Sequence, residues 1–241
     1  MSREVYGIDW LKSKLMPGDG AAAGGEADLA GWKDADWERI ASRCFTAHDW
    51  SELLKLHPQV AERCDWKKFG GLDWRLLLIG HPEFADYCYW DKLDNYDWWG
   101  LLLEQPQLAE HCDWDKLYGE SWSELLSVHP EFAVHCDWAK LDGGNWSELL
   151  RHRPEFAGHC DWSKLDGWAW SGLLCARPQF AEHCSWERLE SEDWQCLLSV
   201  RPEFADMCDW SKLDPEDRML LLDSHPEFRG KCPFDDLKET E

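Results

Sequence analysis

The sequence predicts an all-α fold, an α-solenoid or superhelix of short α-helices and 3₁₀ turns with 24 residues in each repeat. Prolines recur at this step without an insertion or deletion, at Pro58, Pro82, Pro106, Pro130, Pro154, Pro178, Pro202 and Pro226. A cysteine lies six residues after each proline, from Cys64 to Cys232. No part of the repeat alternates apolar and polar residues as a half-buried strand would. A fixed period of this kind is typical of a stacked array in which each unit contacts only its neighbours.

Two rows of tryptophan keep the same period. The first Trp ladder runs from Trp66 to Trp210, two residues after each cysteine. The second Trp ladder runs from Trp50 to Trp194 and precedes leucine pairs such as Leu125–Leu126. Such rows could be stacking platforms for single-stranded nucleic acid or sugars. Their strict recurrence beside the leucine pairs favours core packing, so we predict that both ladders are buried.

Pro130 opens the first element that we expect within one repeat. A proline suits the first turn of a helix because the N–H group that it lacks would have no partner there. We therefore expect a short helix from Pro130 to about His135. Phe132 and Cys136 should turn inward, since positions i and i+4 share one face of a helix.

The rest of the repeat predicts a 3₁₀ turn and a second helix. Asp137 is expected to cap a 3₁₀ segment over 138–141, where there is room for only one turn. After a polar break at 142–144, Asn145 is expected to begin a longer helix, with Glu148 as its capping-box partner. The apolar side of this helix is supplied by Trp146, Leu149 and Leu150.

Four regions are expected along the chain. Residues 1–31 form an N-terminal segment with a flexible Gly/Ala linker, and residues 32–57 form an N-terminal cap and a half repeat. Seven 24-residue repeats occupy 58–225, and a degenerate eighth repeat with a C-terminal cap occupies 226–241. Polar terminal units keep a solenoid from stacking end to end, so we expect a monomer or a weak dimer.

Composition narrows the expected partners and compartment. The formal net charge of −23 disfavours nucleic acid and anionic membranes as partners and favours a protein or peptide with a basic surface. No apolar run is long enough to cross a bilayer, and the N-terminus lacks the pattern of a signal peptide. We therefore expect a cytoplasmic protein. In that reducing compartment the 11 cysteines are expected to be thiols rather than disulfides.

A resemblance rests on the recurring signature PEFA, CDW, KL, W and LL, which covers roughly residues 49–237. This signature resembles the tandem 24-residue repeats of uncharacterised bacterial proteins. The period, and the alternation of a short helix with a 3₁₀ turn, are also similar to the leucine-rich variant repeat. That second resemblance implies an α/3₁₀ superhelix without strands and implies no activity. The Cys ladder and the two Trp ladders are not part of the leucine-rich variant pattern.

The recurring His and Cys residues suggest a metal or disulfide array, but the repeat geometry argues against one. Neighbouring packed helices lie about 10 Å apart, whereas a disulfide needs Cα atoms within about 7 Å and zinc needs sulfur ligands about 2.3 Å away. His135 directly precedes Cys136 and would point about 100° away from it on a helix. We expect the ladder cysteines to be small buried apolar residues, with no metal or cofactor. A surface metal or redox role is the alternative.

The candidate partner surface consists of variable positions before the ladder cysteine and before the proline. It comprises His111, His135, His159, His183, Arg153, Arg177 and Arg201. Aromatic residues outside the ladders are expected to be exposed, namely Tyr89, Tyr96, Trp99, Tyr118 and Trp168. A row of cations could bind anions, at Lys68, Lys92, Lys116, Lys140, Lys164, Arg188 and Lys212. We expect instead that each cation pairs with a nearby carboxylate such as Asp137.

Catalytic motifs are absent from the sequence, which has no nucleophile elbow, phosphate loop, HExxH or CxxC. We therefore expect no enzyme. The leading hypothesis is a non-catalytic repeat scaffold that mediates protein–protein interaction through an extended acidic surface. One alternative is an acidic nucleic-acid mimic that occupies a DNA- or RNA-binding protein, motivated by the regularly spaced Asp113, Asp137, Asp161 and Asp209. Another is a structural spacer or designed scaffold without a ligand.

Overall fold

The computed structural model describes residues 46–56 and 58–231. The expectations for the N-terminal segment, the linker, most of the N-terminal cap and the last ten residues fall outside these ranges. The chain divides into two compact units, unit 1 ending at Asp113 and unit 2 beginning at Trp114. We describe each unit by itself.

All regular secondary structure in the described ranges is helical, and no strand occurs there. Each repeat contributes one α-helix of ten residues. Unit 1 holds α3 (Ala47–Leu56), α4 (Gly71–Gly80) and α5 (Asn95–Glu104). Unit 2 holds α6 (Gly119–Val128), α7 (Gly143–His152), α8 (Gly167–Ala176), α9 (Ser191–Val200) and α10 (Pro215–Ser224).

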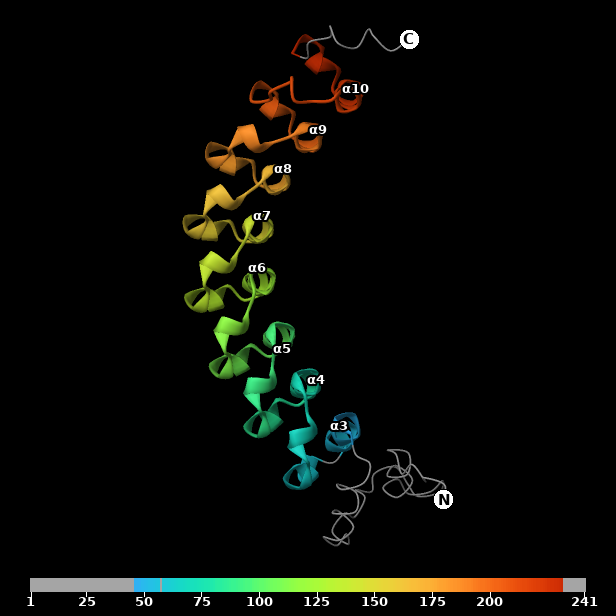
Figure 1. Ribbon diagram of the computed structural model, residues 1–241, viewed down its shortest axis with the longest axis vertical. Helices are drawn as coiled ribbons and strands as arrows, with labels where there is room; N and C mark the ends of the chain where they lie inside the picture. Colours follow the sequence, from blue (N-terminus) through green and yellow to red (C-terminus); the bar gives the residue numbers. More distant parts are fainter. Residues whose placement is uncertain (1–45, 57, 232–241) are drawn as a thin grey trace, which may run out of the picture. The chain divides into compact units, whose positions relative to one another are not determined.

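From α3 to α9, each pair of successive α-helices is joined by two 3₁₀ segments, a longer one that begins at the recurring proline and a three-residue one that begins at the first-ladder Trp. Only the longer segment occurs between α9 and α10, and another follows α10. In unit 1 these are η2 (Pro58–Arg63), η3 (Trp66–Lys68), η4 (Pro82–Tyr87), η5 (Trp90–Lys92) and η6 (Pro106–His111). In unit 2 they are η7 (Trp114–Lys116), η8 (Pro130–His135), η9 (Trp138–Lys140), η10 (Pro154–His159), η11 (Trp162–Lys164), η12 (Pro178–His183), η13 (Trp186–Arg188), η14 (Pro202–Asp206) and η15 (Pro226–Gly230). Within each unit the α-helices lie along one side and the 3₁₀ segments along the other (Figure 1). The predicted all-α solenoid is confirmed.

The core of each unit lies between these two layers. Every Trp of the second ladder has 0% of its surface exposed, as the sequence predicts. The Leu pair that follows each Trp, the Phe of each PEF sequence and the Leu after each short 3₁₀ turn are also buried. Because the same positions are buried in successive repeats, the core continues from one repeat to the next inside a unit.

Helix α7 shows how a helix begins and ends. Asp142, not Asn145, is its N-cap: the Asp142 carboxylate accepts a hydrogen bond from Asn145 N at 2.8 Å, and Asn145 Oδ1 accepts one from Asp142 N at 3.1 Å. The expected cap is therefore wrong by three residues. The helix ends at His152 because Arg153 precedes a proline, which disfavours helical geometry, and has φ −128° and ψ 73°.

Two glycines begin α6 and α7, respectively. A Cβ atom at Gly143 would collide with the carbonyl oxygen of Lys164 in the next repeat, and one at Gly119 would collide with that of Lys140. The first turns of α6 and α7 therefore approach the neighbouring 3₁₀ turn closely. A Cβ atom at either glycine would force the two repeats to shift.

The segment from Pro130 to His135 is helical as expected, but it is a 3₁₀ helix throughout. Phe132 is buried, whereas Cys136 follows the end of the segment in an extended conformation (φ −72°, ψ 125°). The i and i+4 relation of an α-helix therefore does not apply to these two residues. The short turn predicted after Asp137 is confirmed as 3₁₀, with Asp137 accepting a hydrogen bond from Ala139 N at 3.1 Å.

No helix among the described residues is both long enough and apolar enough to cross a membrane.

Candidate interaction surface

The four histidines of the candidate partner surface lie on the 3₁₀ side of the repeats. Each ring stacks on the first-ladder Trp of the preceding repeat. The pairs are His111 on Trp90 (4.4 Å between centroids, 9° between planes), His135 on Trp114 (4.5 Å, 6°), His159 on Trp138 (4.4 Å, 8°) and His183 on Trp162 (4.4 Å, 8°). All four histidines are exposed. The ring that a partner could contact is therefore held in a fixed orientation by the fold.

The first-ladder Trp beneath each histidine is half-buried, so the prediction that this ladder is fully buried is wrong except at Trp210. Trp138 shows the arrangement. One face stacks on the buried Trp146 of the same repeat at 5.5 Å and 16°, and the other face receives His159 of the next repeat. Trp138 lies on a three-residue turn at the surface, so only the neighbouring repeat can cover its outer face.

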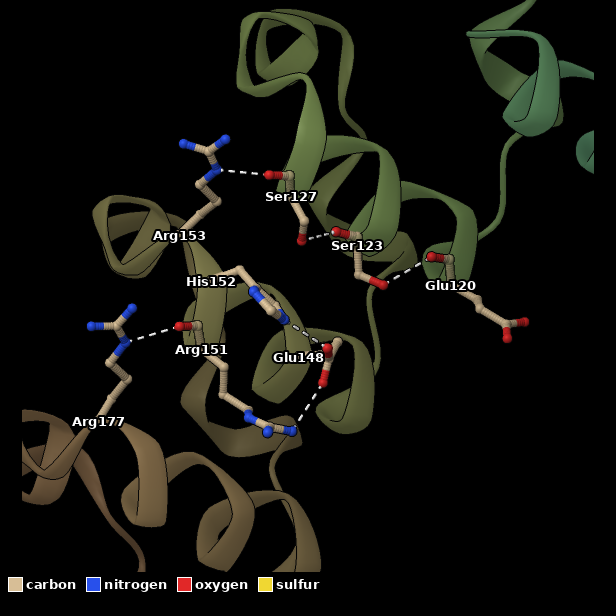
Figure 2. Close-up of polar contacts among 8 residues, drawn as sticks. All are labelled: Glu120, Ser123, Ser127, Glu148, Arg151, His152, Arg153 and Arg177. Atoms are coloured by element: carbon tan, nitrogen blue, oxygen red, sulfur yellow. Dashed lines mark hydrogen bonds and ion pairs between the residues drawn. The ribbon is translucent and has the colours of Figure 1, made fainter. Parts of the chain in front are cut away.

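The three arginines of the candidate surface also link neighbouring repeats. Arg153 Nε donates to Ser127 O, Arg177 Nε to Arg151 O and Arg201 Nε to Cys175 O, each at 2.9 Å. Figure 2 shows the first two of these bonds. Each acceptor lies in the last turn of the preceding α-helix, where carbonyl groups have no partner within the helix and attract positive charge. The arginine therefore caps the preceding helix.

Part of each guanidinium group remains outside this capping bond. The side chains of Arg153 and Arg201 are about one-third exposed, and their Nη1 atoms lie 3.9 Å from Oε1 of Glu155 and Glu203, respectively. Such exposed pairs are weak and compete with water. The same arginine side chain can therefore cap the preceding helix and contact a partner.

Helix α7 adds two basic residues that the sequence analysis missed. Arg151 Nη1 donates to Glu148 Oε2 at 3.1 Å, and His152 Nε2 lies 3.0 Å from Glu148 Oε1 (Figure 2). Glu148 is therefore not the capping-box partner of Asn145. Together with Arg153 and Arg177, these residues form a local basic cluster in an acidic chain, and the sequence run RHR at 151–153 was its available signal.

Most of the recurring cations bond to main-chain oxygens, although we expected each to pair with a nearby carboxylate. Lys164 Nζ donates to the main-chain oxygens of Ala139 and Leu141, both at 2.7 Å, in the preceding repeat. Equivalent pairs of bonds are made by Lys92, Lys140, Arg188 and Lys212. Carboxylate pairs occur at Lys68 with Asp65 (3.9 Å) and at Lys212 with Glu190 (3.4 Å). At these five positions the cation's charge is directed to main-chain carbonyl groups of the neighbouring repeat.

The recurring carboxylates, by contrast, face solvent. Asp113, Asp137, Asp161 and Asp209 are exposed, and so are the glutamates that follow the recurring proline. The Ser163 side chain hydrogen-bonds the Asp161 carboxylate at 2.6 Å and holds its pKa below the ordinary value, and Ser211 does the same for Asp209. These two carboxylates therefore stay charged even in mildly acidic solution.

The ladder cysteines are half-buried thiols rather than fully buried core residues. Burial, with a smaller contribution from the charge of Asp137, raises the pKa of the Cys136 thiol to about 12. Within the described ranges, no three His, Cys, Asp or Glu side chains meet in a possible metal site. A protonated thiol at this position is a poor nucleophile and a poor metal ligand.

The aromatic residues outside the ladders are mostly exposed as predicted. Tyr89 is 40% exposed, Tyr96 57%, Tyr118 62% and Trp168 72%. Trp99 is half-buried, so its predicted exposure is wrong.

No protein family, no characterised protein and no solved structure matched this chain in our comparisons. A proposal about its function therefore rests on the fold and on the arrangement of its side chains.

Proposed function

We propose that this chain is a non-catalytic repeat scaffold that binds a protein or peptide with a basic surface through its rows of exposed carboxylates. One observation carries the proposal. Five of the seven recurring cations direct their donors to main-chain oxygens of the preceding repeat, as Lys164 does at 2.7 Å, while the recurring carboxylates face solvent. The acidic surface is thus available to a partner along each unit.

The non-catalytic part of the proposal is supported by the way in which the polar residues are used. The Lys and Arg rows hold repeats together, the recurring Asp residues cap turns, and the His row stacks on Trp. Burial raises the pKa of the ladder thiols, which disfavours their use as nucleophiles. Each of these arrangements recurs from repeat to repeat, whereas an active site usually departs from the regularity of its scaffold.

The surface proposed for the partner is the 3₁₀ side of a unit. It presents the stacked histidines, the guanidinium groups of Arg153, Arg177 and Arg201, and the exposed carboxylates such as Glu131 and Asp137. We propose a cytoplasmic protein that is a monomer or weak dimer and needs neither nucleic acid, membrane nor cofactor. A net charge of −23 gives long-range attraction to a basic partner, which salt would weaken.

The test compares two variants with the same change in charge. In the first, Glu131, Glu155 and Glu203 on the 3₁₀ side are changed to Gln. In the control, Glu124, Glu192 and Glu216 on the exposed side of the α-helices are changed to Gln; all six residues are exposed. Proteins captured from a lysate by the wild type are purified, and their binding is titrated.

We expect saturable binding that the first variant weakens about tenfold and the control variant retains. Equal loss in both variants would mean that only net charge matters and would contradict a defined surface. Absence of any saturable partner would favour a structural spacer.

The nucleic-acid mimic is the second candidate, and the exposed row Asp113, Asp137, Asp161 and Asp209 favours it. A mimic occupies the nucleic-acid site of its partner, so duplex DNA should displace this chain from the purified partner. If the partner binds the chain and DNA simultaneously, the mimic is excluded and the scaffold is favoured.

A further inference from the structure

Two cysteines of unit 2 lie outside the Cys ladder. Cys175 is in α8 and Cys196 is in α9, so both belong to the α-helical side, whereas the ladder cysteines belong to the 3₁₀ side. The equivalent positions one repeat earlier hold Arg151 and Gly172. Neither cysteine is therefore explained by the repeat that accounts for the others.

The two cysteines meet where neighbouring helices pack. Helices α8 and α9 lie side by side in unit 2 (Figure 1). The Sγ atom of Cys175 lies 4.0 Å from the carbonyl oxygen of Cys196, so the Cys175 thiol contacts Cys196 across the two helices. The offset of 21 residues brings them together, which the 24-residue step of the ladder does not do for equivalent cysteines.

The surroundings of this pair differ from those of the ladder thiols. Cys196 is exposed and Cys175 is half-buried, so a small reagent can reach the pair from solvent. The groups that act on the ladder thiol of Cys136 are Asp137 and Lys140, with no second thiol among them. The same holds for the ladder thiols of Cys64, Cys88, Cys160 and Cys184, so the contact between two cysteines sets Cys175 and Cys196 apart from these.

We propose that Cys175 and Cys196 are a redox-modification site, which forms a reversible disulfide between α8 and α9 by exchange with a low-molecular-weight disulfide of the glutathione class. A disulfide needs the two Sγ atoms to approach to about 2.05 Å. Side chains that already interact across one helix–helix contact need only a local adjustment for that.

The exchange takes place in two steps. The thiolate of Cys196, the more exposed cysteine, attacks one sulfur of glutathione disulfide; a protein–glutathione disulfide forms and one glutathione thiolate leaves. The thiolate of Cys175 then attacks Sγ of Cys196, forming the intramolecular disulfide and expelling the second glutathione thiolate. The protons of the two protein thiols end on the two glutathione molecules. Two electrons pass from the protein to the reagent, and reduced glutathione reverses both steps.

Charges around the pair favour such a reagent. Burial and then Cys196 raise the pKa of the Cys175 thiol, to about 11, whereas Arg201 and Arg151 act in the opposite direction. Arg201 Nε also donates to the carbonyl oxygen of Cys175. Glutathione disulfide carries several carboxylates, so the nearby arginines attract it toward the thiols. Arg151 and Arg201 thereby gain a role toward an anionic reagent.

The disulfide would connect two neighbouring repeats next to the arginine row. A crosslink stabilises a fold mainly by restricting the unfolded chain. The oxidised protein should therefore melt at a higher temperature than the reduced protein.

The experiment uses the full chain, fully reduced and then equilibrated in mixtures of glutathione disulfide and glutathione of increasing ratio. Samples are quenched with acid, the remaining thiols are alkylated, and the digest is analysed by mass spectrometry. We expect one crosslinked peptide pair that joins Cys175 to Cys196, the loss of two alkylatable thiols, and full reversal by excess glutathione. Stable glutathione adducts without that crosslink, or equal oxidation of Cys136, would overturn the proposal.

Three variants separate the proposed steps. Cys175→Ser should retain a stable glutathione adduct on Cys196, and Cys196→Ser should form neither adduct nor crosslink at this pair. The control Cys136→Ser removes a ladder thiol and should leave the crosslink and its reversal unchanged. The melting temperature should rise on oxidation in the wild type and in Cys136→Ser, but not in Cys175→Ser. An equal rise in Cys175→Ser would mean that another disulfide stabilises the fold.

Discussion

The two Trp ladders have the same residue type and the same period but different surroundings. Trp146 of the second ladder lies in a ten-residue α-helix and has 0% of its surface exposed. Trp138 of the first ladder lies on a three-residue 3₁₀ turn and is half-buried. One face of Trp138 is covered by Trp146, and the other by His159 of the next repeat. The second ladder therefore forms the core of a unit, while the first joins its repeats.

This difference explains why the residue before each ladder cysteine can vary. This residue covers the flat ring of a first-ladder Trp, and several types of side chain can do so. Tyr87 stacks on Trp66 with 4.8 Å between ring centroids, and a histidine takes the equivalent position in later repeats. The second ladder is less variable, because each of its indoles from Trp50 to Trp194 fills a closed core; only in the last helix, α10, does a buried Arg218 take the equivalent position.

The largest effect should come from the second ladder. Trp146→Ala removes a fully buried indole, and we expect the free energy of unfolding to fall by about 3–5 kcal/mol. Denaturant unfolding followed by circular dichroism would measure it. Val134→Ala is the control, because Val134 is 84% exposed and should change stability little. A loss no greater than that of the control would place the second ladder outside the core.

The same truncation in the first ladder should cost less. Trp138→Ala removes a half-buried ring, and we expect a loss of about 2 kcal/mol, less than for a fully buried Trp. The difference between the two variants, measured under the same conditions, is the relevant quantity. Equal losses would mean that burial does not distinguish the ladders.

A third prediction concerns the turn that carries Trp138. Lys164 Nζ bonds Ala139 O and Leu141 O, so it holds this turn to the next repeat. Lys164→Met keeps the length of the side chain but removes the donor, and we expect a loss of about 1–2 kcal/mol. Lys67→Met, at an exposed lysine of unit 1, is the control. Equal effects of the two variants in urea unfolding would show that the loss of charge, not of the main-chain bonds, determines stability.

The sequence predicts the fold because the period is read directly from the Pro, Cys and Trp positions. The helical class, the short 3₁₀ turn after Asp137, and the buried Phe132 and Trp146 are confirmed. Each depends on residues within one repeat, where local preferences and burial agree. The start of α7 is missed because glycine has a poor helical preference, and the close approach of Gly143 to Lys164 O in the next repeat is not visible within one repeat.

The candidate surface is predicted less well because its residues interact between repeats. His159 and Arg153 stand out in the sequence as variable positions, but their neighbours, Trp138 and Ser127 O, lie in the preceding repeat. Lys164 has a carboxylate nearby in sequence, and only the stacking of repeats places main-chain oxygens closer. A period establishes that repeats stack, but it does not establish their rotation or spacing. Contacts across the junction therefore need the structure.

The smallest predicted effect tests that junction directly. In a double-mutant cycle of Trp138→Ala and His159→Ala, the interaction free energy should be about 0.5–1.5 kcal/mol, because the rings stack at 4.4 Å and 8°. The single variant His159→Ala should lose a similar amount. Replacing His159 by Tyr should retain most of the stability, since Tyr87 covers Trp66 in the same way. An interaction free energy of zero would mean that His159 lies next to Trp138 without stabilising it. Contacts within its own repeat would then be the ones that stabilise the first-ladder Trp.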